Sequence, residues 1–169
     1  MTYWFSADHH FFHANIIHFC SRPFESVEEM NETMVQRWNE RVKPEDTIYH
    51  LGDFGLGRFE WIEAIKKQLN GKVHLIPGTH DKKLTKLATL FESISDLKII
   101  TIEKQKIVLC HYAMRVWPYS HYGSWMLYGH SHGRLPLVPN SLDVRVDTNN
   151  FYPYSYDDVR KKIEFFPFQ

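Results

Sequence analysis

Short apolar runs alternate with segments of helical periodicity along the chain. Apolar residues recur at helical spacing over 26–42 and 58–69, and the first segment opens with the capping-box pattern Ser26-Val-Glu-Glu. We expect a short helix over 83–91 and a closing helix over 155–163. The apolar runs between these segments predict strands over 3–6, 47–51, 72–76, 97–102, 106–110, 124–128 and 142–146.

The order of these elements indicates a fold class. Strands alternate with helices in the first half of the chain, whereas strands follow one another in the second half. The runs 97–102 and 106–110 flank a short polar turn, which predicts a β-hairpin. This order predicts an α/β (layered α+β) single domain over 1–169, built around mixed sheets. A chain of 169 residues is long enough to bury a core.

Polar residues gather directly after the predicted strands. In chain order they are Asp8, His10, Asp53, Thr79, His80, Asp81, His111, His130 and His132. Because ligands bind beyond the carboxyl ends of strands in open α/β sheets, we expect these side chains to meet. Each short motif alone is weak evidence, but five in succession are difficult to obtain by chance. Imidazoles and carboxylates suit transition metals, and two such ions can clamp the attacking and leaving oxygens of a reaction at phosphorus.

As a set, the motifs resemble the signature of the calcineurin-like metallophosphoesterases. They are Asp-x-His at 8–10, Gly-Asp at 52–53, Gly-x-His-Asp at 78–81, His111, and Gly-His-x-His at 129–132. The stretches ADHHFFHANII and YHLGDFGLG are similar to a branch of small bacterial and phage phosphoesterases. The resemblance spans nearly the whole chain. It implies a β-sandwich flanked by helices, with the site on loops at one edge.

The resemblance also implies a cofactor and roles for site residues. The cofactor would be two divalent metal ions, manganese in first place, with iron, nickel, cobalt and zinc as alternatives. The ligands would be Asp8, His10 and His132 for the first metal, Asp53 as a bridge, and His111 and His130 for the second metal. His80 would serve the leaving-group oxygen as a general acid or as a positive charge, and Asp81 would orient it.

Position 79 departs from the family pattern. The family's third motif is Gly-Asn-His-Asp, whose Asn oxygen binds the second metal, and this chain has Thr79 there. The shorter hydroxyl side chain has less reach, which predicts a weaker second metal site. The sequence leaves open whether Thr79 is a natural variant or an attenuation. The alternative to an enzyme is a metal-binding protein that acts by binding, but the chain keeps both His80 and Asp81, which favours the enzyme.

Charge and composition narrow the expected partners. Lys plus Arg and Asp plus Glu both number 20, so the formal net charge is zero. This balance argues against long nucleic acid, and a small phosphorylated, nucleotide-like substrate fits better. The candidates for substrate contacts are Arg22, Arg115 and His121. A solvated surface position explains Arg22 equally well, and packing of the aromatic loop is the more frequent explanation for the region of Arg115 and His121.

The remaining features are less specific. Cys20 and Cys110 lie far apart, the N-terminus does not read as a signal peptide, and no apolar run is long enough to span a bilayer. These features predict a cytoplasmic protein without disulfides and without a membrane partner. We expect His13 and Asp147 beside the site, and packing or surface positions for His9, His18, His50 and His74.

Overall fold

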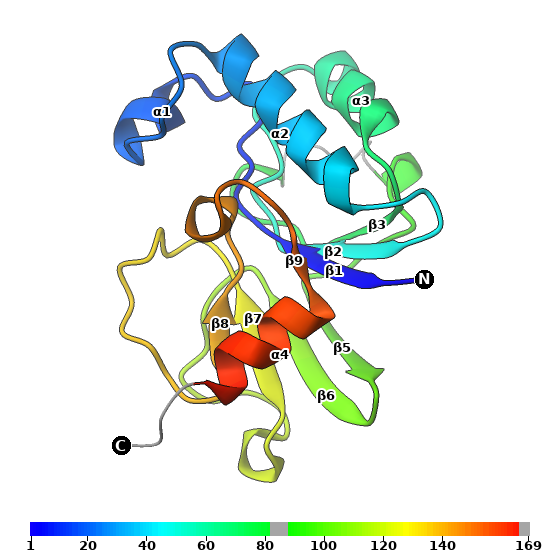
Figure 1. Ribbon diagram of the computed structural model, residues 1–169, viewed down its shortest axis with the longest axis vertical. Helices are drawn as coiled ribbons and strands as arrows, with labels where there is room; N and C mark the ends of the chain where they lie inside the picture. Colours follow the sequence, from blue (N-terminus) through cyan, green and yellow to red (C-terminus); the bar gives the residue numbers. More distant parts are fainter. Residues whose placement is uncertain (82–87, 166–169) are drawn as a thin grey trace.

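The structure of the protein is a computed structural model that describes residues 1–81 and 88–165 (Figure 1). Its α-helices are α1 (Asn15–Phe19), α2 (Val27–Arg41), α3 (Phe59–Gln68) and α4 (Tyr156–Glu164). The strands are β1 (Tyr3–Ser6), β2 (Thr47–His50), β3 (Lys72–Leu75), β4 (Ser93–Ile94), β5 (Leu97–Ile102), β6 (Gln105–Cys110), β7 (Trp125–Tyr128), β8 (Ser141–Asp143) and β9 (Tyr154–Ser155).

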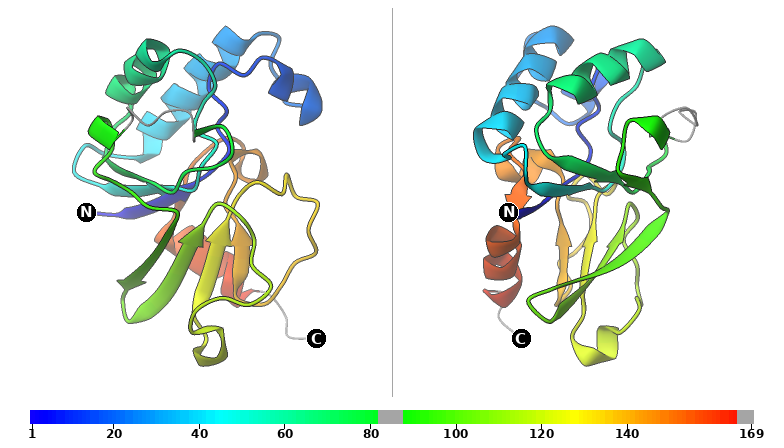
Figure 2. Two further views of the ribbon diagram at one scale, coloured as in Figure 1. Left: turned by 180° about the vertical axis from the view of Figure 1, so that it is seen from behind. Right: turned by 90° about the vertical axis from the view of Figure 1, so that its right-hand side faces the viewer.

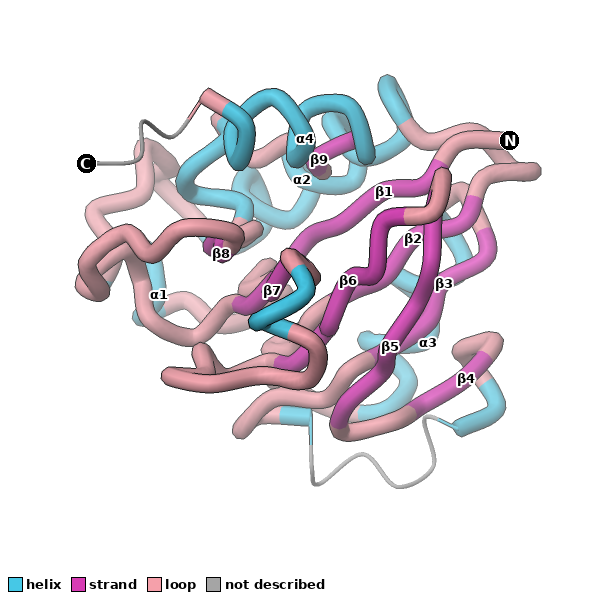
Figure 3. Tube along the Cα trace, turned by 90° about the horizontal axis from the view of Figure 1, so that it is seen from below, coloured by secondary structure: helices cyan, strands magenta, loops and turns pink. Residues whose placement is uncertain are grey.

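Two sheets form the centre of the molecule. The first has the strand order β4-β3-β2-β1-β9 and is parallel except for β9, and the second has the order β5-β6-β7-β8. In the view from below, β5, β6 and β7 lie in front of β1, β2 and β3 (Figure 3). Helices α2 and α3 cover the outer face of the first sheet, and α4 packs along β8 and β9 (Figures 1 and 2). The predicted sandwich flanked by helices is confirmed.

Strand alternation divides the apolar residues between two cores. Because successive residues of a strand point to opposite faces, Trp4 and Ile48 join the core beneath α2 and α3, with Met34 and Trp38 of α2. Phe5 belongs to the core between the two sheets. The strands β1 and β2 are therefore apolar on both faces, which is why they read as continuous apolar runs.

The helix boundaries follow the capping residues. The Ser26 hydroxyl accepts a hydrogen bond from the N–H of Glu29 at 3.1 Å, so α2 begins where the capping box predicts. Ser155 and Asp158 form a complete capping box at the start of α4. None of the helices in the described ranges is long and apolar enough to cross a membrane.

Some predicted elements differ in the structure. The strand expected over 142–146 ends at Asp143, and a 3-10 turn begins at Val146, whose N–H donates to the carbonyl of Ala7 at 3.1 Å. The chain leaves the second sheet at this point to reach the first, so local periodicity overestimates the strand. The sequence did not predict α1, β4 or β9, which are all short. The helix expected over 83–91 lies largely outside the described residues.

Candidate metal centre

The site is built on loops beyond the carboxyl ends of β1, β2, β3, β6 and β7. Backbone hydrogen bonds join these loops: the N–H of Asp8 donates to the carbonyl of Gly52, that of His10 to Asp53, and that of Gly129 to His111. Parallel pairing of β1 with β2 and of β6 with β7 brings the loops to one edge. The expected convergence of the polar residues therefore follows from the topology.

The first donor group consists of Asp8, His10 and His132. Their ligand atoms lie within 4.8 Å of one another. His10 Nε2 lies 3.8 Å from Asp8 Oδ1, and both atoms are buried without a hydrogen-bond partner. Buried polar atoms are normally paired. A cation between them would satisfy both, so this arrangement fits a divalent metal ion.

The second donor group consists of Asp53, His111 and His130, also within 4.8 Å of one another. The ring of His111 has a defined orientation, because Nδ1 lies 2.6 Å from the carbonyl of Leu51 and must donate to it. The neutral ring therefore presents the lone pair of Nε2, which lies 3.5 Å from Asp53 Oδ2 and 3.2 Å from His130 Nδ1.

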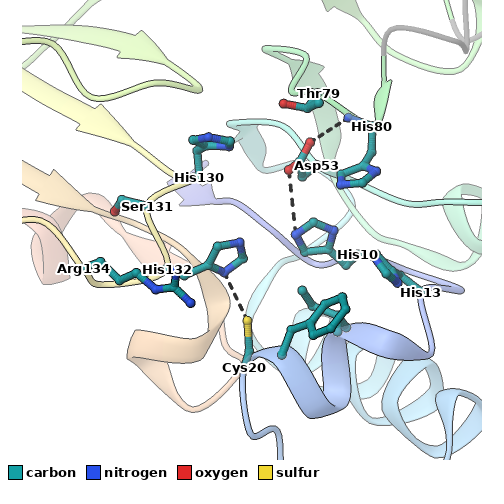
Figure 4. Close-up of a pocket in the computed structure, with 12 residues that line it drawn as sticks. His10, His13, Cys20, Asp53, Thr79, His80, His130, Ser131, His132 and Arg134 are labelled. Carbon is teal, nitrogen blue, oxygen red and sulfur yellow. Dashed lines mark hydrogen bonds and ion pairs between the residues drawn. The ribbon is translucent and has the colours of Figure 1, made fainter.

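One carboxylate oxygen joins the two donor groups. Asp53 Oδ2 lies 3.8 Å from His10 Nε2 in the first group and 3.5 Å from His111 Nε2 in the second. The other oxygen, Oδ1, accepts from the N–H of His80 at 3.0 Å. The carboxylate is thus held by the backbone on one side and directed between the two groups on the other, as a bridging ligand requires (Figure 4).

The backbone of the donors is unusual. Five of the six donor residues have positive φ angles of 48–63°: Asp8, His10, Asp53, His130 and His132. Such angles are uncommon for residues other than glycine, and they cluster at functional sites whose surroundings enforce them. The chain therefore turns sharply just after β1, β2 and β7, which directs these donor side chains into one space.

Close backbone approach also supports the donors. A Cβ added at Gly129 would lie 2.5 Å from Asp8 Oδ2, the oxygen that accepts from the N–H of His130 at 2.9 Å. Only glycine fits at position 129 without moving the Asp8 carboxylate. The glycine of the Gly-His-x-His motif thus has a packing reason.

Burial sets the protonation of the donors. It raises the pKa of the Asp8 carboxyl to about 8, and it lowers the pKa of the His10 imidazole to about 2. For Asp53, the adjacent His111 imidazole and the hydrogen bond from the backbone N–H of His80 outweigh burial and hold the pKa well below its usual range. Burial also lowers the pKa of His130 and His132, so these rings and His10 are ready to coordinate in their neutral form. At His111 the contact with Asp53 outweighs burial and raises the pKa, so His111 and Asp8 both lose a proton more readily beside a bound cation.

A pocket of about 610 Å³ opens over the donors (Figure 4). Thr79 and His80 line it, and the ring of His80 lies 5.2 Å from that of His10 and 5.5 Å from that of His13. The Thr79 hydroxyl lies 3.1 Å from the Tyr112 hydroxyl. His13, expected beside the site, is thus in the pocket wall next to His80.

Asp81 has different contacts from those expected. Its two oxygens accept from the N–H groups of Gly78 at 2.9 Å and Phe54 at 3.0 Å. The carboxylate therefore ties the loop after β3 to the loop after β2. It positions His80 through the backbone of this loop rather than through the imidazole ring.

The three candidate substrate residues lie away from the pocket lining. The Arg22 side chain is buried, donates to the Asp8 and His9 carbonyls at 2.7 and 2.8 Å, and pairs with Asp147. Its donors are engaged by the protein, so it supports the loop that carries Asp8, and the expectation of a substrate contact is corrected. Arg115 and His121 are exposed and are absent from the residues that line the pocket.

The structure adds residues that the sequence did not single out for this pocket. Ile16 and Phe19 line it from α1, Cys20 lines it from the C-cap of that helix, and Arg134 lines it from the loop after His132. Cys20 Sγ lies 3.2 Å from His132 Nδ1, although 112 residues separate them in the chain. The sequence contained no signal for this wall, because α1 is too short to show periodicity.

The fold and the donor groups define a class: an α/β sandwich whose loops fit a pair of divalent metal ions. A family model of the calcineurin-like phosphoesterase superfamily domain matches residues 4–147. The chain therefore belongs to this superfamily, and membership supports metal-dependent hydrolysis of phosphoesters. The narrower resemblance to bacterial and phage enzymes stays a prediction.

The relatives include proteins without an assigned function. The uncharacterized protein MJ1445 of Methanocaldococcus jannaschii is 34% identical over 167 residues, which cover 94% of this chain and 89% of that protein. The crystal structure of AQ665, a protein of unknown function from Aquifex aeolicus, matches with a TM-score of 0.77 at 26% identity, over 96% of this chain and 99% of that chain. A novel archaeal phosphodiesterase shares the fold, with a TM-score of 0.54 at 20% identity over 86% of this chain and 82% of that chain.

Proposed function

We propose that the protein is a dinuclear metal-dependent phosphohydrolase that cleaves a small, nucleotide-like phosphodiester or phosphomonoester. The observation that carries the proposal is the position of Asp53 Oδ2 between His10 Nε2 and His111 Nε2, at 3.8 and 3.5 Å. A carboxylate shared by two sets of imidazoles is suited to two adjacent divalent ions. Bound there, such ions supply a hydroxide nucleophile at neutral pH and offset the charge of the phosphate.

The chain's own residues provide the remaining parts of the reaction. Asp8, His10 and His132 would hold one ion, and Asp53, His111 and His130 the other. His80 lines the pocket and its backbone N–H is anchored to Asp53, so the imidazole is available to donate a proton to the leaving oxygen. Imidazole nitrogens and carboxylate oxygens without thiolates accept several first-row ions, of which we propose manganese first, with iron, nickel, cobalt and zinc as alternatives.

Thr79 would make the second ion the weaker of the two. Its hydroxyl lies at hydrogen-bond distance from the Tyr112 hydroxyl, and a threonine extends less far than the asparagine of the family motif. The second donor group then has one protein ligand fewer. We infer that occupancy of the second site, and with it turnover, depends on metal concentration.

The test is hydrolysis of bis-p-nitrophenyl phosphate with added Mn²⁺. We expect turnover by the native chain, a loss of about a hundredfold or more in Asp53→Asn, and a gain in Thr79→Asn at low metal. The matched control is Asp46→Asn, a buried carboxylate at the opposite end of β2 that binds the N–H of Thr2 and the indole of Trp4. This control removes the same charge and should leave kcat unchanged below its unfolding temperature.

The outcomes separate the two hypotheses from the sequence. If native protein and Thr79→Asn both fail to hydrolyse esters with any first-row ion but still bind the ion, the protein acts by binding rather than by turnover. If Thr79→Asn hydrolyses the ester rapidly and the native chain does not, the protein is an enzyme whose activity Thr79 attenuates.

A further inference from the structure

One wall of the pocket is not accounted for by the donors. Ile16, Phe19 and Cys20 are spaced i, i+3 and i+4, so they share one side of the turn formed by α1, and all three line the pocket. Ile16 is buried and anchors this wall in the core. Cys20 contacts His132. Phe19 has neither role, and its side chain is 68% exposed.

The exposed ring of Phe19 contacts His13, which is a neighbour of the proposed proton donor His80. Its edge-to-face contact with His13 has a centroid distance of 6.3 Å and an interplanar angle of 88°, and His13 lies 5.5 Å from His80. Because Phe19 is exposed and lines the pocket, a ligand in the pocket can reach its ring on the side of His13. A single exposed phenylalanine is ordinary, but this one borders a polar pocket that must hold an organic phosphate.

Arg134 supplies a positive charge to the same pocket. It follows Gly133, whose φ is +69° and whose added Cβ would lie 2.5 Å from Arg145 Nη2. Glycine at 133 allows the bend that places Arg134 beside His132 (Figure 4). Within the described part of the chain, Arg134 forms no ion pair with an acidic side chain.

The dimensions of the pocket agree with an organic ligand. A cavity of about 610 Å³ is within the range of sites for small organic molecules, which is far more than the volume of a phosphate group. Phe19 and Arg134 line this space together with the donors, and Arg134 lies beside the donor His132 (Figure 4). A pocket that offers both an aromatic ring and a guanidinium suits a molecule that carries both a planar ring and an anion.

We propose that Phe19 and Arg134 form a subsite for a nucleoside phosphate, with the base stacked on Phe19 and a phosphate oxygen paired with Arg134. The reacting phosphorus then lies over Asp53, and the organic group lies on the His80 side. This inference rests on the proposed function, because it names the substrate class of the same site.

The test is calorimetric binding of three probes to the Mn²⁺-loaded protein: AMP, ribose 5-phosphate and inorganic phosphate. We expect AMP to bind on the order of tenfold more tightly than ribose 5-phosphate, because stacking of the base is absent from the latter. Phe19→Ala should remove this difference without changing the affinity for ribose 5-phosphate, whereas Phe19→Tyr should keep it. The matched control is Phe165→Ala, which removes an aromatic ring that is 90% exposed and should change nothing.

Arg134 has a different expected signature. Arg134→Gln should weaken all three probes by a similar factor, on the order of tenfold, because it removes an ion pair with the phosphate rather than a contact with the base. Equal binding of AMP and ribose 5-phosphate, or an AMP affinity that Phe19→Ala leaves unchanged, would overturn the subsite even if bis-p-nitrophenyl phosphate is hydrolysed. Conversely, if AMP binds more tightly than ribose 5-phosphate but no ester is hydrolysed with any metal ion, the proposed function is refuted and the subsite is supported.

Discussion

Arg22 offers a direct test of how the loop that carries Asp8 and His10 is held. Its guanidinium is buried, and its side-chain exposure is 0% against 12% for its partner Asp147. Nε and Nη2 donate to the two Asp147 oxygens, both at 2.9 Å, while Nη2 and Nη1 donate to the carbonyls of Asp8 and His9. We predict that Arg22→Met destabilises the fold, because it leaves the Asp147 charge and two backbone carbonyls without their donors.

The magnitude follows from burial. Removing one partner of a buried ion pair costs about 3–5 kcal/mol, and the small residual exposure of Asp147 favours the lower part of that range, about 3–4 kcal/mol. For a chain of this length, 1 kcal/mol shifts the unfolding temperature by roughly 2–4 °C. The expected decrease for Arg22→Met is therefore about 6–16 °C. Arg22→Lys keeps the charge without the two-pronged contact and should lie between the two proteins.

The assay is thermal unfolding of the metal-free protein by circular dichroism in EDTA, which separates fold stability from metal loss. The control Arg115→Met makes the same replacement at an exposed arginine and should change the unfolding free energy by less than about 0.5 kcal/mol. If Arg22→Met moved the unfolding temperature by less than about 2 °C and instead raised KM for a phosphodiester, the reasoning from burial would be wrong. Arg22 would then be the substrate residue that the sequence suggested.

Three further predictions concern the metal centre. Cys20→Ala should lower the affinity for Mn²⁺ about tenfold in a calorimetric titration. With an ion on His132 Nε2, the Nδ1–H is left to donate to Cys20 Sγ, 3.2 Å away, and this contact orients the His132 ring. An unchanged affinity would mean that Cys20 does not orient His132. Gly129→Ala should abolish the binding of Mn²⁺ at micromolar concentrations, because the new Cβ would displace the Asp8 carboxylate, while the circular dichroism spectrum stays that of the native protein. Undiminished binding of Mn²⁺ would contradict this packing argument. Burial raises the pKa of Asp8 to about 8, so its carboxyl is mostly protonated at pH 7 in the metal-free protein. Metal binding at pH 7 should therefore release on the order of one proton, and the release should become progressively smaller above pH 8. Titrations in buffers of different ionisation enthalpy measure that release, and a release that grew with pH would reverse the assigned sign.

Local chemistry made much of the fold predictable. The Ser26 capping box and the helical spacing after it located α2, and continuous apolar runs located the central strands because both of their faces are buried. The short elements were not predictable. Helix α1, for example, has five residues, too few for a periodic pattern, and its ends depend on packing of Ile16 and Ile17 against the core.

The sequence by itself determined which side chains are available to the site, because each donor directly follows an apolar strand and parallel strands end at a common edge. Only the tertiary structure decided how they meet. The hydrogen bond from the N–H of His130 to Asp8 joins residues 122 positions apart, and the place of Asp53 Oδ2 between two histidines depends on three separate loops. Tertiary contacts also assigned Arg22 to Asp147 and brought Phe19 and Arg134 to one pocket. Such contacts depend on the packing of distant segments, and no local sequence pattern records that packing.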